Sequence, residues 1–340
     1  MSLISYNSQL EIEPTGFINL GTTCYFNALL QSMLSCTSLI DVLTTKKYVS
    51  NAINAQPTSV DVCLVNNPAE SNNITNLIIK YIELNRTLKQ ANSVTDIQDQ
   101  KIIKDELSNY APLIWKQMIK KLSNDKKIPI QSFMQGQQCA GEGFHYLLES
   151  MEEFPLIQKL FMHRYKSLIH CSNCNKWISE VECLYSLFDV ESNLNSEQIK
   201  KFDKYHIKSE NMNEFILKQS SYVEGFKCTK CNDTDDKFRI NVLVMVPEIL
   251  TVMAKKYTLE EKLDIYTEFP ETLKFNGNDS DMIYEAVSQI EHVGGKNGGH
   301  YWAIVKRKGG WFNVNDMSIS PSKFQPTKNT YIVFYHLKKK

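Results

Sequence analysis

Two Cys-x-x-Cys motifs constrain the fold of this 340-residue chain more than any other feature. The first is Cys171-Ser-Asn-Cys174 and the second is Cys228-Thr-Lys-Cys231. Each motif can present two thiolates to one ion, and two such motifs complete a closed tetrahedral site. Because residues 175–227 separate them, one shared ion would tie two hairpins together across a long insertion. We therefore predict one structural zinc held by four cysteines; four unrelated thiols or a redox pair are the alternatives.

A further cysteine lies near the N-terminus, where residues 16–25 read GFINLGTTCY. Cys24 follows a Gly-Thr-Thr turn and precedes YFNALLQSML, whose apolar residues recur at the spacing of one helix face. We predict a helix with one buried face that starts near Cys24, with Thr22 or Thr23 as its N-cap. The first turn of a helix favours an anion. Cys24 is therefore a candidate nucleophile, and a small buried core residue is the alternative.

Composition narrows the class of protein. Lys+Arg and Asp+Glu are equal at 38 each, so the chain has no overall bias towards nucleic acid or an anionic membrane. No stretch approaches the roughly 18 apolar residues of a membrane span, and the start MSLISYNSQLEIEP lacks the features of a secretory signal. Nine cysteines, four of them in the two motifs, indicate reduced thiols. We expect a cytoplasmic or nuclear protein.

Helical patterns come first along the chain, and strand patterns follow. Residues 74–90 and 112–122 have helical spacing, and residues 133–154 end in a helix with one apolar face. From about residue 156 the pattern changes to short β-like runs, which include YKSLIHC, FRINVLVMV, ILTVMAKKY, HYWAIVKRK, WFNVND and YIVFYHL. This order predicts an α+β fold, in which a helical half packs on a mostly antiparallel sheet.

A candidate catalytic histidine opens a predicted hairpin, EHVGGKNGGHYWAIVKRKGGWFNVND, at residues 291–316. His300 follows Gly298 and Gly299 and begins a strand to which WFNVND returns as the partner. The glycines either punctuate turns or let a substrate backbone approach the histidine closely.

The hairpin sequence leaves two registers open. A loop centred on 307–308 places His300 opposite Asn315, which would then orient the imidazole as in a Cys-His-Asn arrangement. A loop centred on 309–310 instead places Asn315 opposite Ile304, where it is an ordinary strand residue.

Together these segments resemble the ubiquitin-specific proteases, papain-like cysteine peptidases that cut at the C-terminus of ubiquitin. GFINLGTTCYFNALLQSML resembles the cysteine box of that family, and HVGGKNGGHYWAIV with WFNVND resembles its histidine box. QQCAGEGFHYLL resembles its QQDxxEFLxxLL segment, VPEILTVMAKKY its LPxxLxxxLKRF segment, YIVFYHL its closing strand, and the two CxxC pairs its zinc-bearing fingers. The matching pieces occur in the family's order and cover most of the chain.

The resemblance implies a papain-like fold with thumb, palm and zinc-ribbon fingers in one catalytic domain, residues 1–340. Its subregions would be a helical thumb at 1–155, fingers with the zinc site at 165–245 and a palm with the histidine box at 246–340. It implies no organic cofactor. Its partners would be ubiquitin and ubiquitinated proteins, bound by a monomer that engages neither nucleic acid nor a membrane.

The resemblance also assigns the reacting residues by position. Cys24 matches the nucleophile, His300 the base and Asn315 the third member of the triad. This assignment favours the hairpin loop centred on 307–308, in which Trp311 pairs with Ile304.

Other matched positions would bind the substrate or assist the reaction. Asn19 takes the place of the family's oxyanion-hole side chain, and Asp316 that of a second acidic residue that assists. Glu142 matches the acidic position that meets the arginines of the ubiquitin tail. Cys139 departs from the family by replacing the Asp of its QQD segment.

We therefore expect a deubiquitinating cysteine isopeptidase that hydrolyses the bond after the C-terminal glycine of ubiquitin. One alternative is a catalytically weak ubiquitin-binding scaffold on the same fold. Another is a protease for a different Gly-Gly-tailed modifier, which the departure at Cys139 keeps open. A zinc module that binds nucleic acid is a third, and the balanced charge argues against it.

Overall fold

The structure is a computed structural model. It describes residues 12–54, 73–91, 97–126, 131, 138–151, 155–191, 218–223, 225–235, 237–257, 261–275, 281–295 and 298–338. Residue contacts divide the chain into two compact units. Unit 1 comprises Met1–Gln158 and Val287–Gln325, and unit 2 comprises Lys159–Ala286 and Pro326–Lys340. Helices precede strands along the chain, so the α+β class is confirmed. The thumb, fingers and palm boundaries stay a prediction.

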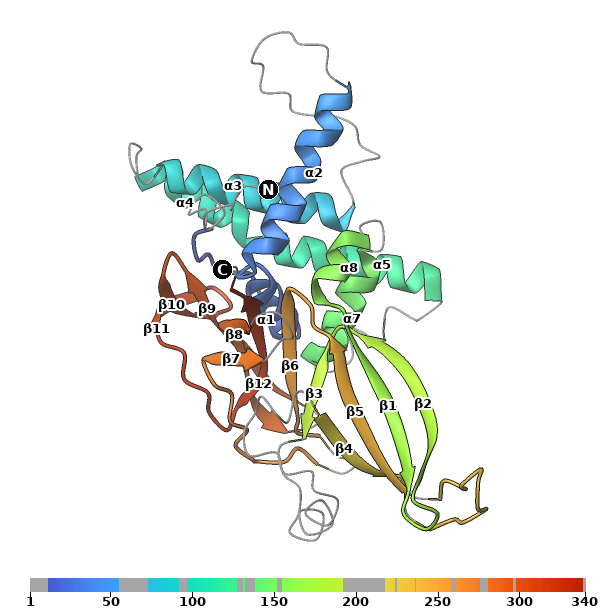
Figure 1. The fold of residues 1–340 in the computed structure, drawn as a ribbon. Helices are drawn as coiled ribbons and strands as arrows, with labels where there is room; N and C mark the ends of the chain where they lie inside the picture. The colour runs from blue at the N-terminus through green and yellow to red at the C-terminus, as the bar shows by residue number, and fades with distance from the viewer. Residues whose placement is uncertain are drawn as a thin grey trace. The chain divides into compact units, whose positions relative to one another are not determined.

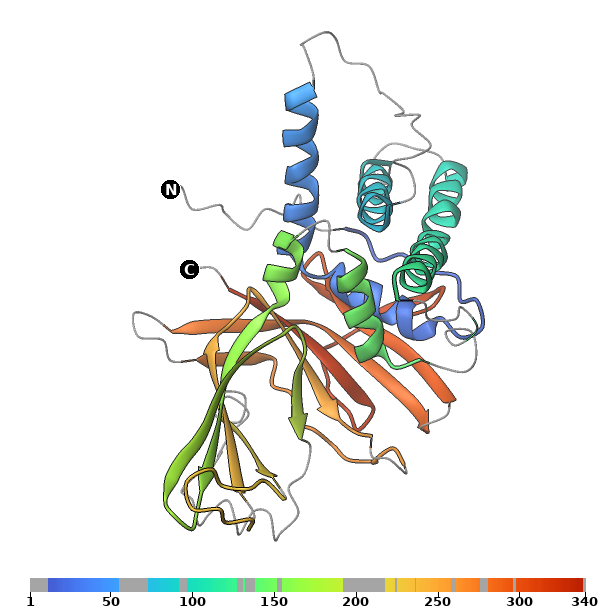
Figure 2. The same cartoon turned by 90° about the vertical axis from the view of Figure 1, so that its right-hand side faces the viewer.

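Unit 1 packs a group of helices with a strand hairpin around its first helix. Its helices are α1 (Cys24–Met33), α2 (Thr37–Asn54), α3 (Ile74–Ala91), α4 (Ile97–Ser108), α5 (Tyr110–Lys126) and α7 (Ala140–Ser150). Its strands are β9 (Gly298–Arg307), β10 (Gly310–Asn315), β11 (Ser318–Ser322) and the end of β8 (Met282–Gly295). Helix α8 (Pro155–Phe161) and strand β8 cross the boundary between the units. Helix α1 contacts α5, α7, β9 and β10, so it lies at the core of this unit (Figures 1 and 2).

The sequence predicted one buried face for α1, but all of its residues are buried. Elements on several sides explain this difference, since strands and helices both pack on it. The polar residues Asn27, Gln31 and Ser32 are therefore in the interior. At the other end of α1 from Cys24, the Arg307 guanidinium from β9 donates to the Gln31 carbonyl oxygen at 2.8 Å. This bond satisfies a carbonyl near the helix C-terminus and fixes α1 against β9.

Helix α7 begins after Cys139 and buries its apolar face, as its pattern predicted. A side chain at Gly143 would place its Cβ 2.8 Å from the Tyr25 ring, so glycine lets α7 approach α1 closely. The Tyr25 hydroxyl in turn accepts a hydrogen bond from Trp115 Nε1 at 2.8 Å. Burial raises the pKa of Tyr25 to about 12, so its hydroxyl remains neutral.

Unit 2 contains an antiparallel sheet with the strand order β2-β1-β5-β4, labelled in Figure 1. Its strands are β1 (His163–Cys171), β2 (Lys176–Tyr185), β4 (Lys218–Val223) and β5 (Lys237–Met245). A second group comprises β3 (Phe188–Glu191), β6 (Ile249–Lys255), β7 (Thr272–Phe275), the start of β8 and β12 (Thr330–Leu337). In this group β3 runs parallel to β6, whereas β12 pairs with β6 and β7 with β8 in antiparallel fashion.

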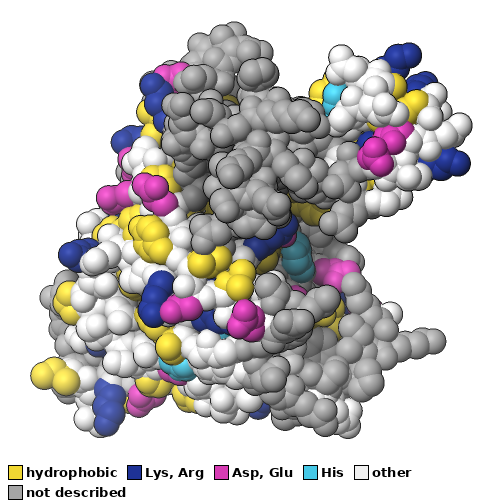
Figure 3. Space-filling view, turned by 90° about the horizontal axis from the view of Figure 1, so that it is seen from below, with side chains coloured by type: hydrophobic (Ala, Val, Ile, Leu, Met, Phe, Trp, Pro, Cys, Tyr) yellow, Lys and Arg dark blue, Asp and Glu magenta, His cyan; other side chains and the backbone are white. Residues whose placement is uncertain are grey.

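The face shown in Figure 3 carries side chains of both charges among hydrophobic and polar ones. Lys and Arg are interspersed with Asp and Glu over its coloured part, as expected from their equal numbers in the chain.

No single helix within the described residues is long and apolar enough to cross a membrane. The pair formed by α1 and Thr37–Thr45 meets that criterion of length and composition only when its two parts, bent by 78°, are taken together.

His163 gives unit 2 a predictable response to acid. Its ring is fully buried, with centroids 5.4 Å from that of Tyr165 and 5.3 Å from that of Phe188. Burial lowers the pKa of His163 to about 4, against a smaller opposing effect of the Phe161 backbone. The unfolded chain takes up this proton near pH 6.5, so folding stability should fall as the pH drops below that value, by about 2 kcal/mol at pH 5.

Denaturant unfolding at pH 7.5 and pH 5 measures this loss. His163→Phe keeps an aromatic ring at the site and removes the titration, so this variant should lose about 2 kcal/mol less than the parent. Equal losses in the two proteins would show that His163 does not set the acid sensitivity.

Candidate active site

Cys24 is the first residue of α1 and Thr23 is the N-cap, so the predicted helix start is confirmed. The Thr23 side chain does not cap the helix. Its Oγ1 instead accepts a hydrogen bond from the Leu20 backbone N–H at 2.9 Å, which closes the turn that precedes Cys24. Cys24 is 3% exposed, so little of its surface is open to solvent.

The segment before Cys24 runs against the turn between β10 and β11. Gly16 permits this approach, since a Cβ there would lie 2.6 Å from Met317 Cα. The Phe17 N–H donates to the Asp316 carbonyl oxygen at 2.9 Å. These backbone contacts bring the cysteine-containing segment to the residues that follow the histidine hairpin.

Asn19 uses both ends of its amide. Its Oδ1 accepts hydrogen bonds from the N–H groups of Gly21 at 2.9 Å and Thr23 at 3.2 Å, which shapes the turn. Its Nδ2 donates to Asp316 Oδ2 at 3.0 Å. An amide nitrogen carries two hydrogens, and this bond uses one of them.

The β9–β10 hairpin adopts neither register considered from the sequence. Trp311 lies opposite Lys306, whereas the loop centred on 307–308 required it to face Ile304. The same pairing excludes the loop centred on 309–310. The functional argument therefore placed the loop centre one residue too early.

The turn residues explain this register. Lys308 and Gly309 both have positive φ, 48° and 71°. Two consecutive residues of this kind form a type I′ turn, whose twist matches that of the flanking strands. The local turn preference thus decided the pairing, with lysine accepting a left-handed conformation beside the glycine.

His300 and Asn315 nevertheless meet. Asn315 Oδ1 lies 2.6 Å from His300 Nε2. With Val314 opposite Ala303, this is a diagonal contact between neighbouring strands, and such diagonal pairs remain within reach on one face of a sheet. Because an amide oxygen only accepts, Nε2 carries the proton in this bond and Nδ1 is left for proton transfer.

Asp316 joins the two segments. Its Oδ2 lies 4.0 Å from His300 Nε2 and also accepts the bond from Asn19. Its Oδ1 accepts a hydrogen bond from Asn27 Nδ2 at 2.8 Å. Sequence reasoning did not single out Asn27, for which the available signal was a polar residue one helical turn after Cys24.

The other residues predicted to bind substrate are Gly299, Gly298 and Glu142. A Cβ on Gly299 would overlap the Val293 carbonyl oxygen and lie 2.6 Å from His292 Nε2, so the neighbouring strand β8 already requires glycine there. A Cβ on Gly298 would enter open space. Glu142 is exposed in the first turn of α7.

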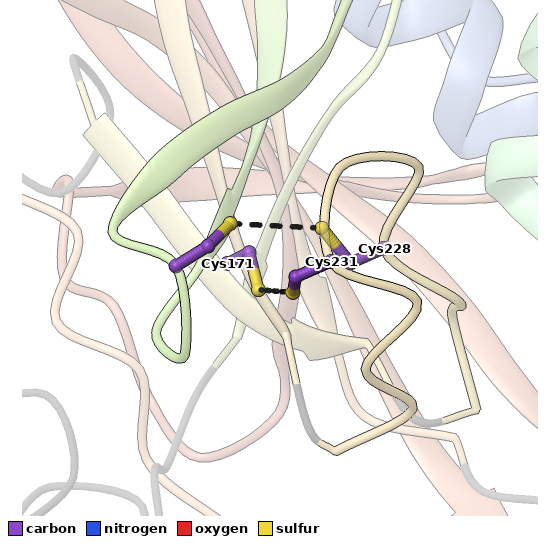
Figure 4. A group of neighbouring side chains, drawn as sticks. Cys171, Cys228 and Cys231 are labelled. Carbon is purple, nitrogen blue, oxygen red and sulfur yellow. Dashed lines mark hydrogen bonds between the residues drawn. The ribbon is translucent and has the colours of Figure 1, made fainter.

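The cysteine cluster lies in unit 2, at one end of its antiparallel sheet. Cys171 ends β1 and Cys174 lies in the turn to β2. Cys228 and Cys231 lie in the loop from β4 to β5, opposite Cys171 (Figure 4). The four sulfurs lie within 4.8 Å of one another. The two hairpins therefore meet as the motif spacing predicted.

The sulfur distances fit a metal site. Cys171 Sγ lies 3.7 Å from Cys231 Sγ, and Cys174 Sγ lies 3.8 Å from Cys228 Sγ. Four sulfurs about 2.3 Å from a tetrahedral zinc are about 3.8 Å apart, whereas a disulfide requires about 2 Å. Zinc bound here would stabilise the fold, since four protein ligands leave no position for a substrate.

The local sequence shapes both metal-binding turns in the same way. Asn175 and Asn232 each follow the second cysteine of a motif and have φ of 55° and 60°, a conformation that asparagine tolerates. The Lys230 N–H also points to Cys228 Sγ at 3.3 Å, as suits a thiolate.

An ion pair between a buried lysine and a partly exposed aspartate adjoins the cluster. Lys237 is fully buried and donates to Asp233 Oδ2 at 2.5 Å, and that oxygen lies 3.8 Å from Cys171 Sγ. Burial alone would lower the pKa of Lys237, but its bond to Asp233 raises it, so the ammonium stays charged. This charge opposes the excess negative charge of four thiolates around one Zn²⁺. Sequence reasoning missed both residues, although they lie within six residues after the second motif.

Comparison with known proteins identifies the family. The family model described as "Ubiquitin carboxyl-terminal hydrolase" matches residues 15–335. Ubiquitin carboxyl-terminal hydrolase 8 of Saccharomyces cerevisiae is 21% identical over 95% of this chain and 70% of its own length. Probable ubiquitin carboxyl-terminal hydrolase 16 of Schizosaccharomyces pombe is 22% identical over 95% and 66%, and ubiquitin carboxyl-terminal hydrolase 25 of Arabidopsis thaliana is 23% identical over 95% and 47%. The chain thus spans about half to seven-tenths of the length of these relatives.

Solved structures agree with this assignment at the level of the fold. The SAGA DUB module Ubp8/Sgf11/Sus1/Sgf73 bound to monoubiquitin matches with a TM-score of 0.61 at 19% identity, over 99% of this chain and 72% of that one. The same module bound to ubiquitin aldehyde matches with a TM-score of 0.60 at 18% identity, over the same shares. The resemblance to ubiquitin-specific proteases is confirmed, and the chain belongs to the ubiquitin carboxyl-terminal hydrolase family of thiol-dependent cysteine peptidases.

Proposed function

We propose that this chain is a deubiquitinase that hydrolyses the bond after the C-terminal glycine of ubiquitin. The observation that carries this proposal is the bond of 2.6 Å between His300 Nε2 and Asn315 Oδ1, on strands packed against the helix that begins at Cys24. This arrangement occurs in a chain of the ubiquitin carboxyl-terminal hydrolase family. Similar structures, although distant in sequence, contain ubiquitin or ubiquitin aldehyde.

The proposed reaction has two covalent steps. The Cys24 thiolate attacks the carbonyl carbon of the last glycine, and His300 gives its Nδ1 proton to the departing lysine amine. His300 then takes a proton from water, which hydrolyses the thioester and regenerates the thiol. Asn315 holds the imidazole through Nε2, and the Asn19 side chain with the Cys24 N–H holds the oxyanion in both steps.

The surroundings of Cys24 suit a glycine-rich tail. A thiol that is 3% exposed admits a chain without side chains more readily than a bulky one. The open space at Gly298 leaves room for a peptide beside His300. Glu142, exposed on α7, is the carboxylate that we assign to an arginine of the ubiquitin tail.

Cleavage of defined substrates by the purified chain tests the function. The panel comprises di-ubiquitins, a ubiquitin C-terminal fluorophore conjugate and the corresponding conjugates of other Gly-Gly-tailed modifiers. We expect release of the fluorophore from ubiquitin. Cleavage of another modifier alone would assign a different substrate, and binding of ubiquitin without cleavage would indicate a scaffold. Size-exclusion chromatography of the same preparation tests the expected monomer, since the similar structures contain Ubp8 with three other proteins.

Asn19→Ala should lower kcat by about 10²–10³ and leave ubiquitin binding in place, because it removes one oxyanion donor. Steady-state kinetics on the ubiquitin conjugate measures the effect. Asn85→Ala is the matched control, since Asn85 is a buried amide of the same unit that bonds to the Glu13 backbone. An Asn19→Ala enzyme with the parent kcat would mean that backbone groups alone hold the oxyanion.

A further inference from the structure

Asn27 occupies the interior of α1, one helical turn after Cys24. It is 3% exposed, and its Nδ2 donates to Asp316 Oδ1 at 2.8 Å and to the Ile18 carbonyl oxygen at 3.3 Å. Both partners can only accept, so the orientation of the amide is fixed by its neighbours.

In this orientation the amide oxygen of Asn27 points away from both of these partners. Within the described part of the chain, Asn27 Oδ1 is buried and has no hydrogen-bond partner. A buried polar atom of this kind destabilises the folded state. An apolar side chain of similar volume would remove this oxygen, but it would also lose both hydrogen bonds of Nδ2, one of them to a carboxylate.

One bond of Asn27 goes to the carboxylate of Asp316, whose second oxygen lies 4.0 Å from His300 Nε2. The other goes to the backbone of Ile18, the residue before Asn19. Asp316 also lies at a tight turn with φ of 49°, outside the regular strands, so its carboxylate depends on side-chain partners for its position. Asn19 and Asn27 supply those partners, one for each carboxylate oxygen.

We propose that Asn27 is a positioning residue of the catalytic site, which holds the Asp316 carboxylate beside His300 and ties the nucleophile helix to the histidine hairpin. It acts through Asp316 and touches neither the substrate nor the reacting atoms. With the carboxylate held, the imidazolium formed after deprotonation of Cys24 faces a fixed negative charge. This inference rests on the proposed function, because it deepens the same site.

Asn27→Leu removes the donor and keeps the volume. We expect kcat on the ubiquitin conjugate to fall about ten-fold with KM unchanged, as for loss of one hydrogen bond to a charged group. The melting temperature should fall by only a few degrees, because removal of the orphaned Oδ1 offsets part of the loss of the two hydrogen bonds. Ser32→Ala is the control, because Ser32 is fully buried on the same helix and its hydroxyl has no partner among the described residues.

A double-mutant cycle separates positioning from packing. Asp316→Asn should lower kcat by itself, and adding Asn27→Leu should then have little further effect, because both changes act on one contact. Additive losses, or a parent-like kcat in Asn27→Leu, would overturn the inference. If Asn27→Leu does not fold, full activity of Asp316→Asn overturns it instead.

A readout without ubiquitin keeps this test distinct from that of the proposed function. Mass spectrometry after brief iodoacetamide treatment at neutral pH measures alkylation of Cys24, which should be slower in Asn27→Leu than in Ser32→Ala. An inactive parent in which this difference persists would contradict the proposed substrate alone. An active parent with equal alkylation in both variants would contradict the positioning role alone.

Discussion

Cys24→Ala should abolish hydrolysis of ubiquitin conjugates while leaving ubiquitin binding largely intact. The expected fall in kcat exceeds about 10³, because no other group replaces the thiolate as nucleophile. Binding should persist, since the substitution removes one atom from the start of α1 and leaves the contacts of Asn19 and Asp316 in place. Steady-state cleavage and titration with ubiquitin measure the two quantities separately.

Cys36→Ala is the matched control for this prediction. Cys36 is fully buried just after α1, and burial raises the pKa of its thiol so that it stays protonated. The control should lose some stability and keep its kcat. A Cys24→Ala protein that retains more than a few per cent of the parent activity would exclude Cys24 as the nucleophile.

Local patterns predicted the elements of this site well. The start of α1 at Cys24, the buried face of α7 and the strands around His300 and Asn315 all follow from spacing over short stretches of sequence. The two cysteine motifs predicted a long-range meeting because their chemistry requires four ligands around one ion. In each case the information lay within one segment or one motif.

Pairing between segments was harder to predict. The hairpin register failed because the functional argument assumed that His300 and Asn315 must be directly opposed, whereas a diagonal contact joins them. The prediction of a single buried face for α1 failed because its neighbours come from both helices and strands. Asn27 was missed for the same reason, since its partner Asp316 lies 289 residues away.

Buried charge near the metal cluster was also beyond the sequence argument. Lys237 and Asp233 have the i, i+4 spacing of an ordinary ion pair, and Asp233 in a loop with Lys237 at the start of β5 suggests exposure to solvent. Their burial depends on how the loop folds around the cysteines. The negative charge of the four thiolates explains why a buried lysine is favourable here, which the sequence pattern alone does not.

Removal of the metal should be the most damaging change for unit 2. Cys171→Ser should lower the bound zinc from one per chain to well under one, and lower the melting temperature by on the order of 10 °C. Cys171 ends β1 and its sulfur lies close to that of Cys231 in the β4–β5 loop, so a zinc held here would join two hairpins that are far apart in sequence. Elemental analysis and thermal unfolding give the two readouts.

Cys139→Ser is the control, because Cys139 lies outside the cluster and its loss should leave the zinc content at one per chain. Treating the parent with a strong chelator should reproduce the melting temperature of Cys171→Ser, and added zinc should restore that of the parent. A closed site of four thiolates offers no position to water or substrate, so any loss of hydrolysis should follow the loss of folded protein. If the parent contains no zinc and Cys171→Ser melts at the same temperature as the parent, the prediction is wrong. The four cysteines would then be ordinary thiols.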